Sequence, residues 1–407
     1  MANLRSADPS TRGVMSIFQK CEGFEAAHMY EAMGLYPYFH PIEEATATEA
    51  RIRGEWKVMV GSNNYLGLTH HPKVLEAASK ALSKYGSGST GSRFLNGTLD
   101  LHYELEHRLA RFFKKEAALV FTTGYQASLG ALATLIDRGD HLFLDRLDHA
   151  SLVDGARLGH GELHRYPHGD FEALRKQLSH MPAGANKLVV SDGVFSMEGS
   201  IVDLPRLVRV ARQHDAQVLI DEAHAVGVLG PDGAGTVSHF GLQDQVDLVL
   251  ATFSKSLASV GGVLAGSESV IHWLRHHSRA LIFTAAMPPS SVAGVLAALE
   301  VMQNEPERRE RLWANTNKVA ECLRGLGFDT GASSTPVIPV LIGDIEKTLH
   351  VWRVLFDEGL FSHPIVPPAV PQNACRIRVS MSAEHSDEQV ERVVAAFARV
   401  ARTMVTV

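Results

Sequence analysis

Cysteine is scarce in this chain of 407 residues. Only Cys21, Cys322 and Cys375 are present, and no two of them form a Cys-x-x-Cys pair. This scarcity argues against a disulfide framework or a cysteine zinc site and favours a reducing compartment. Apolar runs are short as well, because no stretch approaches 18 uninterrupted apolar residues and the start, MANLRSADPSTRG, lacks the apolar core of a signal peptide. We therefore expect a soluble cytoplasmic protein with no transmembrane segment.

A basic surplus is also missing. Lysine and arginine number 39 against 45 aspartates and glutamates, giving a net charge of −6, which does not favour binding to nucleic acid. The motif at residues 221–224, DEAH, is typical of nucleic-acid helicases, but those ATPases also need a phosphate loop that ends in Gly-Lys-Ser/Thr. No Gly-Lys dipeptide occurs anywhere in the chain. The helicase interpretation is therefore rejected.

What the chain does contain is an alternation of amphipathic and short apolar segments. Apolar residues at helical spacing predict helices near residues 71–86 and 101–113. Apolar runs predict strands at 118–121, 141–144, 188–190, 218–220 and 248–251. This order predicts an α/β fold with a mostly parallel sheet, whose ligand site lies at the carboxyl ends of the strands.

The same pattern divides the chain into three parts. Residues 1–50 are expected to form an N-terminal arm, residues 51–294 a large domain, and residues 295–407 a smaller α+β domain. In the last part, a long helical pattern reaches about residue 326, and strands are predicted at 336–341 and 376–380. Ser386 and Gln389 have the spacing of a reciprocal helix cap and predict the start of the final helix.

A glycine-rich stretch, GSGSTG at residues 86–91, matches the dinucleotide fingerprint letter for letter. That fingerprint requires a strand before it and a helix after it, whereas here a predicted helix precedes it. Two alternatives remain from the residues alone: a flexible turn, or a loop that borders an active site.

A set of polar residues follows the predicted strands. Asp221 and His224 end one strand, Lys255 follows the next, and Thr123, Gly124 and Tyr125 open a helix. This set suits pyridoxal phosphate, because a lysine can form a Schiff base, a carboxylate can keep the pyridine nitrogen protonated, and helix N-terminal amides can hold a phosphate.

Longer phrases agree with this interpretation. In order along the chain they are GSGSTGSRFLNGT, TTGYQAS, LDHASLVDG, DGVFSMEG, DEAHAVG, ATFSKSLASVGG, IFTAAMPP and RIRVSMSAEH. As a set, from about Arg53 to the C-terminus, they resemble the α-oxoamine synthases, which are fold-type I pyridoxal phosphate enzymes. FSKS, GSRFLNGT and SAEH most resemble the bacterial serine palmitoyltransferase branch of that family. The alternatives within the family are 2-amino-3-ketobutyrate CoA ligase, 8-amino-7-oxononanoate synthase and 5-aminolevulinate synthase.

The resemblance implies roles for the residues around the cofactor ring. Lys255 would hold the cofactor covalently and then act as the base on the substrate Cα. Asp221 would pair with the pyridinium nitrogen. His224 and Ser196 would contact the phenolic oxygen, and His149 would stack on the ring and touch the substrate.

Phosphate binding is implied for a second group of residues. The backbone at Gly124 and Tyr125 and the hydroxyls of Thr252 and Ser254 would bind it, together with Thr284 from the neighbouring subunit. A shared site of this kind implies a homodimer. No metal ion is expected.

Substrate contacts are implied on both sides of the cofactor. Arg378 would bind the amino-acid carboxylate, with Asn63 near it, whereas Arg376 is expected to face the other side of the strand. Ser92 and the loop at residues 86–91 would approach the partner's cofactor, which favours the active-site alternative for the glycine-rich stretch.

The reaction that the resemblance implies is a decarboxylative Claisen-type condensation. An amino acid (serine, glycine or alanine) and an acyl-CoA would give an α-amino ketone, CoA and carbon dioxide, as in sphingolipid biosynthesis. Peripheral membrane contact through the acyl substrate or product is compatible with this reaction. An aminotransferase or lyase of the same fold, which would not use acyl-CoA, is the alternative outside the family.

Two departures leave the substrates open. Val366 stands where the palmitoyl enzymes carry an arginine, and Ala369 stands where the oxononanoate enzymes carry a threonine; Asn63 also replaces an expected tyrosine. The arm, with no arginine between Arg12 and Arg51, is expected either to cover an acyl chain or to pack in a dimer interface.

Overall fold

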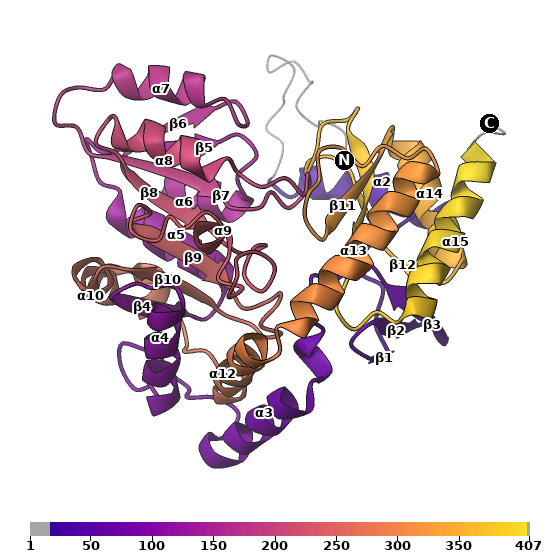
Figure 1. Ribbon diagram of the computed structural model, residues 1–407, viewed down its shortest axis with the longest axis horizontal. Helices are drawn as coiled ribbons and strands as arrows, with labels where there is room; N and C mark the ends of the chain where they lie inside the picture. The colour runs from indigo at the N-terminus through magenta and orange to yellow at the C-terminus, as the bar shows by residue number, and fades with distance from the viewer. Residues whose placement is uncertain (1–16, 405–407) are drawn as a thin grey trace.

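The computed structural model describes residues 17–404 and contains a seven-stranded sheet (Figure 1). Its strand order is β4-β10-β9-β8-β7-β5-β6. The strands are β4 (Ala117–Phe121), β5 (His141–Asp145), β6 (Glu162–Tyr166), β7 (Lys187–Asp192), β8 (Gln217–Asp221), β9 (Leu248–Thr252) and β10 (Gly262–Gly266). Only β10 runs against its neighbours β4 and β9, while the pairs from β9 to β6 are parallel. The predicted mostly parallel sheet is confirmed.

Helices cover both faces of this sheet. They are α4 (Asp100–Phe112), α5 (Gly124–Leu135), α6 (Ala150–Leu158), α7 (Phe171–Ser179), α8 (Leu204–Arg212), α9 (Thr236–His239), α10 (Glu268–His277) and α11 (Arg279–Ile282). Successive strand residues enter different apolar clusters: Phe143 joins the cluster that contains residues of α7 and α8, whereas Leu142 and Leu144 join the one that contains residues of α5 and α6. Side chains alternate along a strand, so burial of both faces explains the continuous apolar runs seen in the sequence.

Two smaller sheets form the second lobe. β11 (Val337–Gly343), β14 (Cys375–Ser380) and β13 (His363–Ile365) form one. β1 (Glu44–Ala45), β2 (Glu49–Ile52), β3 (Glu55–Met59) and β12 (Leu360–Phe361) form the other, in which β3 pairs with β12 in parallel. Residues 55–59 therefore lie beside the C-terminal part of the chain. The predicted boundaries at 50/51 and 294/295 stay predictions.

The remaining helices connect or flank the lobes. They are α1 (Gln19–Glu22), α2 (Ala26–Ala32), the 3-10 turn η2 (Leu68–His70), α3 (Pro72–Tyr85), α12 (Pro289–Asn304), α13 (Glu307–Gly325), α14 (Ile345–Asp357) and α15 (Asp387–Met404). The expected cap of α15 is present, since Ser386 and Gln389 exchange hydrogen bonds of 3.1 Å in both directions.

The single long helix expected up to about residue 326 is wrong. The structure has two helices, α12 and α13, separated at Glu305 and Pro306. The backbone of Glu305 adopts φ −121° and ψ 65°, outside the helical region. A proline disfavours helical geometry in the residue before it and cannot continue the backbone ladder, which explains the break.

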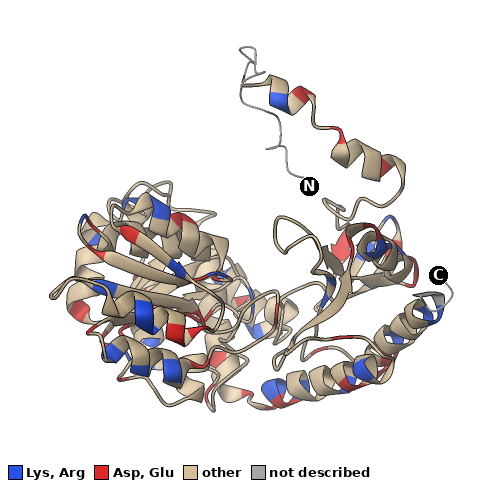
Figure 2. Cartoon of the chain, turned by 90° about the horizontal axis from the view of Figure 1, so that it is seen from above, with Lys and Arg blue, Asp and Glu red and all other residues tan. Residues whose placement is uncertain are grey.

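The N-terminal arm stands away from the two lobes in the view of Figure 2, where α1 and α2 project from the small lobe. Residues 1–16 of the predicted arm lie outside the described residues. No helix within residues 17–404 has the length and apolar character needed to cross a membrane.

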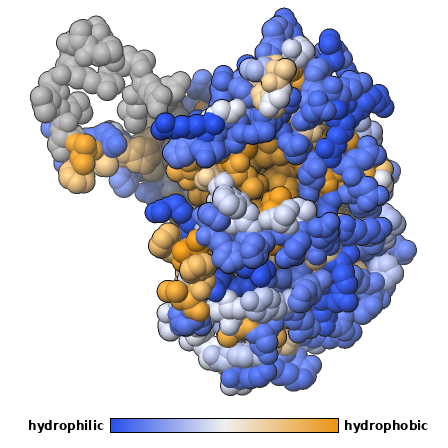
Figure 3. Space-filling view, turned by 90° about the vertical axis from the view of Figure 1, so that its left-hand side faces the viewer, coloured by the Kyte–Doolittle hydropathy of each residue, from blue (hydrophilic) through white to orange (hydrophobic). Residues whose placement is uncertain are grey.

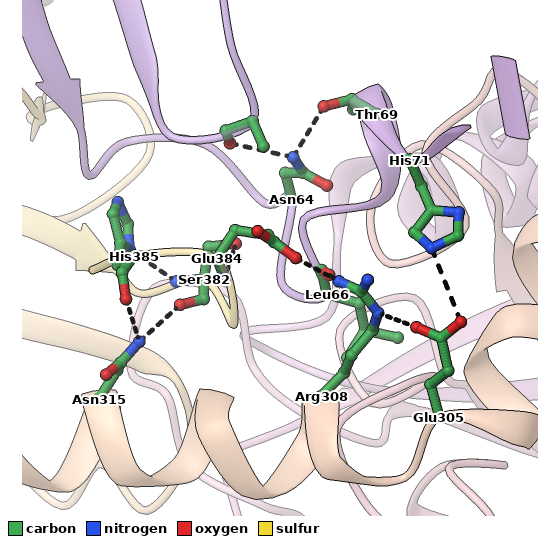
Figure 4. A network of polar contacts seen from close by, with 11 residues as sticks. Asn64, Leu66, Thr69, His71, Glu305, Arg308, Asn315, Ser382, Glu384 and His385 are labelled. Atoms are coloured by element: carbon green, nitrogen blue, oxygen red, sulfur yellow. Dashed lines mark hydrogen bonds and ion pairs between the residues drawn. The ribbon is translucent and has the colours of Figure 1, made fainter. Parts of the chain in front are cut away.

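The two lobes are joined by a polar network at the start of α13 (Figure 4). Arg308 donates to the Leu66 carbonyl and pairs with Glu305 and Glu384. Further along α13, Asn315 donates to the carbonyls of Ser382 and His385 at 3.0 Å each.

This network also constrains the turn at Gly67, which has φ +70°. A Cβ built there would lie 2.1 Å from the side chain of Glu384, so only glycine fits. The SAEH phrase at 382–385 thus fixes the segment that follows β3 against the segment that follows β14.

Candidate active site

A cavity of about 340 Å³ lies at the carboxyl ends of the parallel strands. The predicted site residues that line it together are Gly124, Tyr125, His149, Asp221, His224, Thr252, Ser254 and Lys255. They come from the ends of β8 and β9 and the starts of α5 and α6, as expected for an α/β sheet. Their chemical roles are taken up under the proposed function.

The start of α5 forms one wall. The Thr123 hydroxyl caps the helix by accepting from the Gln126 N–H at 3.1 Å. Gly124 allows the helix to approach β9, because a Cβ there would lie 2.6 Å from Thr252 Oγ1. Among the hydrogen bonds of residues 17–404, none uses the N–H of Gly124 or Tyr125. These free amides, and the nearby hydroxyls of Thr252 and Ser254, which lie 2.9 Å apart, are groups of the kind that bind an anion.

His149 is held by the start of α6. Its Nδ1 accepts from the Ser151 N–H at 3.3 Å and lies 2.8 Å from the Ser151 hydroxyl. Burial lowers the pKa of His149. The ring is therefore neutral near pH 7, with its proton on Nε2.

Asp221 and Lys255 carry the charge of the cavity. Burial raises the pKa of Asp221, and the Lys255 ammonium opposes that rise. Burial also lowers the pKa of Lys255 to about 8, against the pull of Asp221. An amine with such a pKa is partly neutral near physiological pH, as a nucleophile or base requires.

Two buried acids beside them were missed from the sequence. Asp192 ends β7 and lines the cavity, and Asp148 accepts from the N–H groups of Asp145 and Asp192 at 2.8 Å each. Burial raises the pKa of both Asp148 and Asp192. Repulsion from Asp145 and Asp221 adds to the rise at Asp148, and repulsion from Asp148 and Asp221 adds to the rise at Asp192. Asp192 follows its strand just as Asp221 does, so its position was the available signal.

His224 connects the cavity to the second lobe through a residue that was not predicted. The Tyr65 hydroxyl lies 2.8 Å from His224 Nδ1 and donates to Asn63 Oδ1 at 3.4 Å. Arg378 in turn donates to the same Asn63 oxygen. Burial, together with Lys255 and Arg378, lowers the pKa of His224 far below its ordinary value. No sequence pattern marked Tyr65, which is almost fully buried.

Arg378 keeps one unpaired donor. Within the described residues, its buried Nε has no hydrogen-bond partner. The expectation that Arg376 faces the other side of β14 is wrong, because residues two apart in a strand share a face. Arg376 instead donates to the Met197 carbonyl at 2.9 Å and pairs with Glu198.

Five predicted residues do not line the cavity of their own chain: Asn63, Ser92, Ser196, Thr284 and Arg378. Ser196 lies in the turn after β7. Thr284 accepts from the Gln126 side chain at 3.1 Å, and Ser92 forms an isolated bridge with Ala285. The loops that contain Ser92 and Thr284 are therefore adjacent, and their roles toward a partner's cofactor stay predictions.

The cavity fits pyridoxal phosphate in its donor set. It combines free helix amides and hydroxyls for a phosphate, a buried carboxylate for a ring nitrogen, and a lysine whose pKa is lowered. The profile of the family described as aminotransferase class I and II matches residues 56–397. The chain belongs to this family.

Relatives and solved structures agree. The chain is 48% identical to a serine palmitoyltransferase of Sphingobacterium spiritivorum, over 94% of this chain and 96% of that protein. It is 38% identical to an 8-amino-7-oxononanoate synthase of Thermoanaerobacter pseudethanolicus, over 91% and 94% of the two chains. A serine palmitoyltransferase from S. paucimobilis superposes with a TM-score of 0.94 at 37% identity, covering 97% of this chain and 100% of that one. The predicted α-oxoamine synthase family and fold-type I architecture are confirmed.

Proposed function

We propose that the chain is a pyridoxal phosphate-dependent acyltransferase that condenses serine with a long-chain acyl-CoA. The products are an α-amino ketone, CoA and carbon dioxide. The observation that carries the proposal is that Lys255, whose pKa is lowered to about 8, and the buried Asp221 line the same cavity beside free helix amides. A solved relative described as serine palmitoyltransferase with pyridoxal phosphate as internal aldimine, with a TM-score of 0.93, supports it.

The cofactor would be held at three points. The amides of Gly124 and Tyr125, with the hydroxyls of Thr252 and Ser254, would bind the phosphate. Asp221 would bind the ring nitrogen through a charge-assisted hydrogen bond. When bound, pyridoxal phosphate supplies an electron sink for the carbanion at the substrate Cα.

Around the ring, the two histidines would be neutral, because burial lowers the pKa of each. His149 would stack on the ring and present Nε2–H to the substrate, because Nδ1 is engaged by Ser151. His224 would contact the phenolic oxygen, held in place by Tyr65. Ser196 and Asn63 remain candidates for further contacts.

Lys255 would move the proton. Its amine takes the proton from the substrate Cα before the new carbon–carbon bond forms to the acyl carbonyl. The CoA thiolate then leaves, carbon dioxide leaves the former carboxyl position, and Lys255 returns a proton to Cα. A base with a pKa near 8 can both accept and release a proton close to neutral pH.

Arg378 would bind the amino-acid carboxylate. Its Nη2 is already turned to Asn63, while its buried Nε has no partner among residues 17–404. A carboxylate at that position would satisfy this donor and make a charge-assisted hydrogen bond.

The acyl chain would occupy an apolar cavity of about 670 Å³ beside the arm. Its walls come from α2 and from the loop after β13, including Tyr30, Ile365, Val366 and Ala369. Val366 and Ala369 keep this wall apolar, where relatives of the family carry polar residues. The arm would thus cover the acyl chain rather than act only in dimer packing.

We also infer a homodimer with shared sites. Phe94, Leu95 and Phe283 are 49%, 78% and 72% exposed beside the bridge between Ser92 and Ala285. On the face of the molecule that Figure 3 shows, apolar side chains also gather in a hollow and along one edge. Burial of such groups favours association. A soluble cytoplasmic dimer is expected, with any membrane contact peripheral and mediated by the acyl group.

The test is a matrix of serine, glycine and alanine against acyl-CoAs of increasing length, with thiol release and the α-amino ketone as readouts. Serine with a long acyl-CoA should give the highest kcat/KM. A preference for glycine or alanine, or for a short or carboxylated acyl group, would instead favour another branch of the family. Transfer of the amino group to a keto acid without thiol release would favour an aminotransferase, and silence across the matrix in cofactor-loaded protein would refute the proposal.

A further inference from the structure

A second cluster of ligand atoms lies on the outer pair of strands, β5 and β6. His141 pairs directly with Glu162 across the two strands, and His164 lies two residues beyond Glu162 on the same face. His141 Nδ1 is 3.1 Å from His164 Nε2, and the two nitrogens are 3.6 and 3.8 Å from carboxylate oxygens of Glu162. All three ligand atoms lie within 4.8 Å of one another.

These distances suit a shared metal ion. Two zinc–nitrogen bonds of about 2.1 Å that meet at roughly 95–110° place their nitrogens about 3.1–3.4 Å apart. A carboxylate oxygen completes a set of two imidazoles and one carboxylate, which zinc prefers and which leaves a position for water. In the metal-free protein the two rings can share an N–H···N hydrogen bond, which the ion would replace.

The two histidines of the cluster are held in place, whereas its glutamate is accessible to solvent. His164 stacks on the buried Phe143 ring at a centroid distance of 4.7 Å, and the backbone of Glu162 donates to the Asp140 carbonyl at 2.9 Å. The side chains of His141 and His164 are only 13% and 16% exposed, whereas that of Glu162 is 68% exposed. Because the histidines are held in place and the Glu162 carboxylate is exposed, an ion can reach the cluster from solvent.

We propose that His141, Glu162 and His164 form a binding site for a divalent transition metal such as Zn²⁺. Among residues 17–404, β6 is the edge strand of the sheet and pairs only with β5. Ligands from both strands would fasten this edge, so an ion that binds the folded chain would raise its stability. The site belongs to residues outside the active-site cavity and does not depend on the proposed reaction.

The test is a calorimetric titration of tag-free, chelator-treated holoenzyme with Zn²⁺. We expect one ion per chain at this site, an affinity at least about tenfold lower in both Glu162→Gln and His164→Gln, and a zinc-dependent rise in Tm that both variants lose. Glu162→Gln is the safer variant for folding because Glu162 is exposed.

The matched control is His272→Gln. His272 and His276 form an exposed pair one turn apart on α10 that could also bind Zn²⁺. If His272→Gln alone abolishes the titration, or if Glu162→Gln binds Zn²⁺ as the unaltered protein does, the proposal is overturned. If both Glu162→Gln and His164→Gln lose the ion while His272→Gln keeps it, the site is established.

Discussion

The two halves of the candidate active site are built in different ways. The cofactor half is lined by residues between 123 and 261, most of them near the ends of strands of one sheet or the starts of the helices that follow these strands. The proposed substrate half would depend on Asn63 and Arg378, which lie 315 positions apart and meet only through tertiary structure. The comparison teaches that a local rule of the α/β fold brings the cofactor-half residues together, whereas long-range packing brings Asn63 and Arg378 together.

The largest effect on turnover is expected from the loss of Lys255 in the cofactor half. Lys255→Ala removes both the covalent link and the base, so we expect turnover to fall by at least about 10³-fold. Thiol release measures turnover, and borohydride reduction with mass spectrometry measures the link. Lys80→Ala, at an exposed lysine on α3, is the control and should retain both. Retention of the link in Lys255→Ala would contradict the assignment.

The pH dependence of cofactor capture tests the same half without any substrate. Only a neutral amine attacks the cofactor aldehyde, and the pKa of Lys255 is lowered to about 8. About 1% of the amine is neutral at pH 6 and about half at pH 8, so capture by apoenzyme should speed up about 50-fold between these values and then level off. Stopped-flow absorbance gives the rate. A rate that keeps rising about tenfold per pH unit up to about pH 10, with no levelling above pH 8, would show an ordinary lysine.

A substitution in the proposed substrate half should raise the KM for the amino acid and leave cofactor binding unchanged. Arg378→Lys replaces a planar fork by a point charge, so the KM for serine should rise about 10- to 100-fold while the cofactor spectrum stays unchanged. The control is Arg376→Lys, which changes an arginine that contacts Met197 and Glu198 instead. An equal rise in both variants would mean that general charge, not Arg378 itself, sets the KM.

Tyr65 is where the two halves can be uncoupled. Tyr65→Phe removes the hydroxyl that lies between His224 and Asn63, and we expect kcat/KM to fall about 3- to 30-fold, the cost of roughly one hydrogen bond of 0.7–2 kcal/mol. The cofactor absorbance band should also change its pH dependence, because His224 loses its Nδ1 partner. Tyr85→Phe, on exposed α3, is the control. An unchanged band would mean that Tyr65 serves folding alone.

The smallest effect is expected for a substitution in the wall of the cavity proposed to hold the acyl chain. Val366→Arg puts a charge into the apolar cavity beside the arm, so kcat/KM should fall about two- to fivefold more for long than for short acyl-CoAs, a difference of at most about 1 kcal/mol. Chain-length profiles of the two proteins measure the difference, with Glu346→Gln at the cavity rim as the control. Equal losses at all lengths would place the acyl chain elsewhere.

This contrast also explains what could be predicted from sequence. Asp221, His224 and Lys255 follow apolar runs, so strand periodicity alone placed them at one edge. Asp192 had the same position but lacked a familiar motif. Tyr65 could not be predicted, because its partner His224 is 159 positions away and no local pattern reports such a pairing.

The predicted extent of one helix and the predicted direction of one side chain were wrong, because a local rule was left out or misapplied. The helix expected up to residue 326 ignored Pro306, whose ring breaks the backbone ladder. Arg376 was assigned to the wrong face, although a period of two places it on the face of Arg378. Ser92 and Thr284 do not line the cavity of their own chain, and their predicted role toward a partner's cofactor stays a prediction.

The parallel pairing of β3 with β12 has a consequence for synthesis of the chain. Val58 pairs with Leu360, 302 positions later (360 − 58). A chain still on the ribosome with residues after 359 unmade carries every residue that lines the cofactor half but lacks both β12 and Arg378. Premature termination between residues 360 and 377 would therefore leave a chain that contains Lys255 but lacks Arg378, the proposed ligand of the substrate carboxylate.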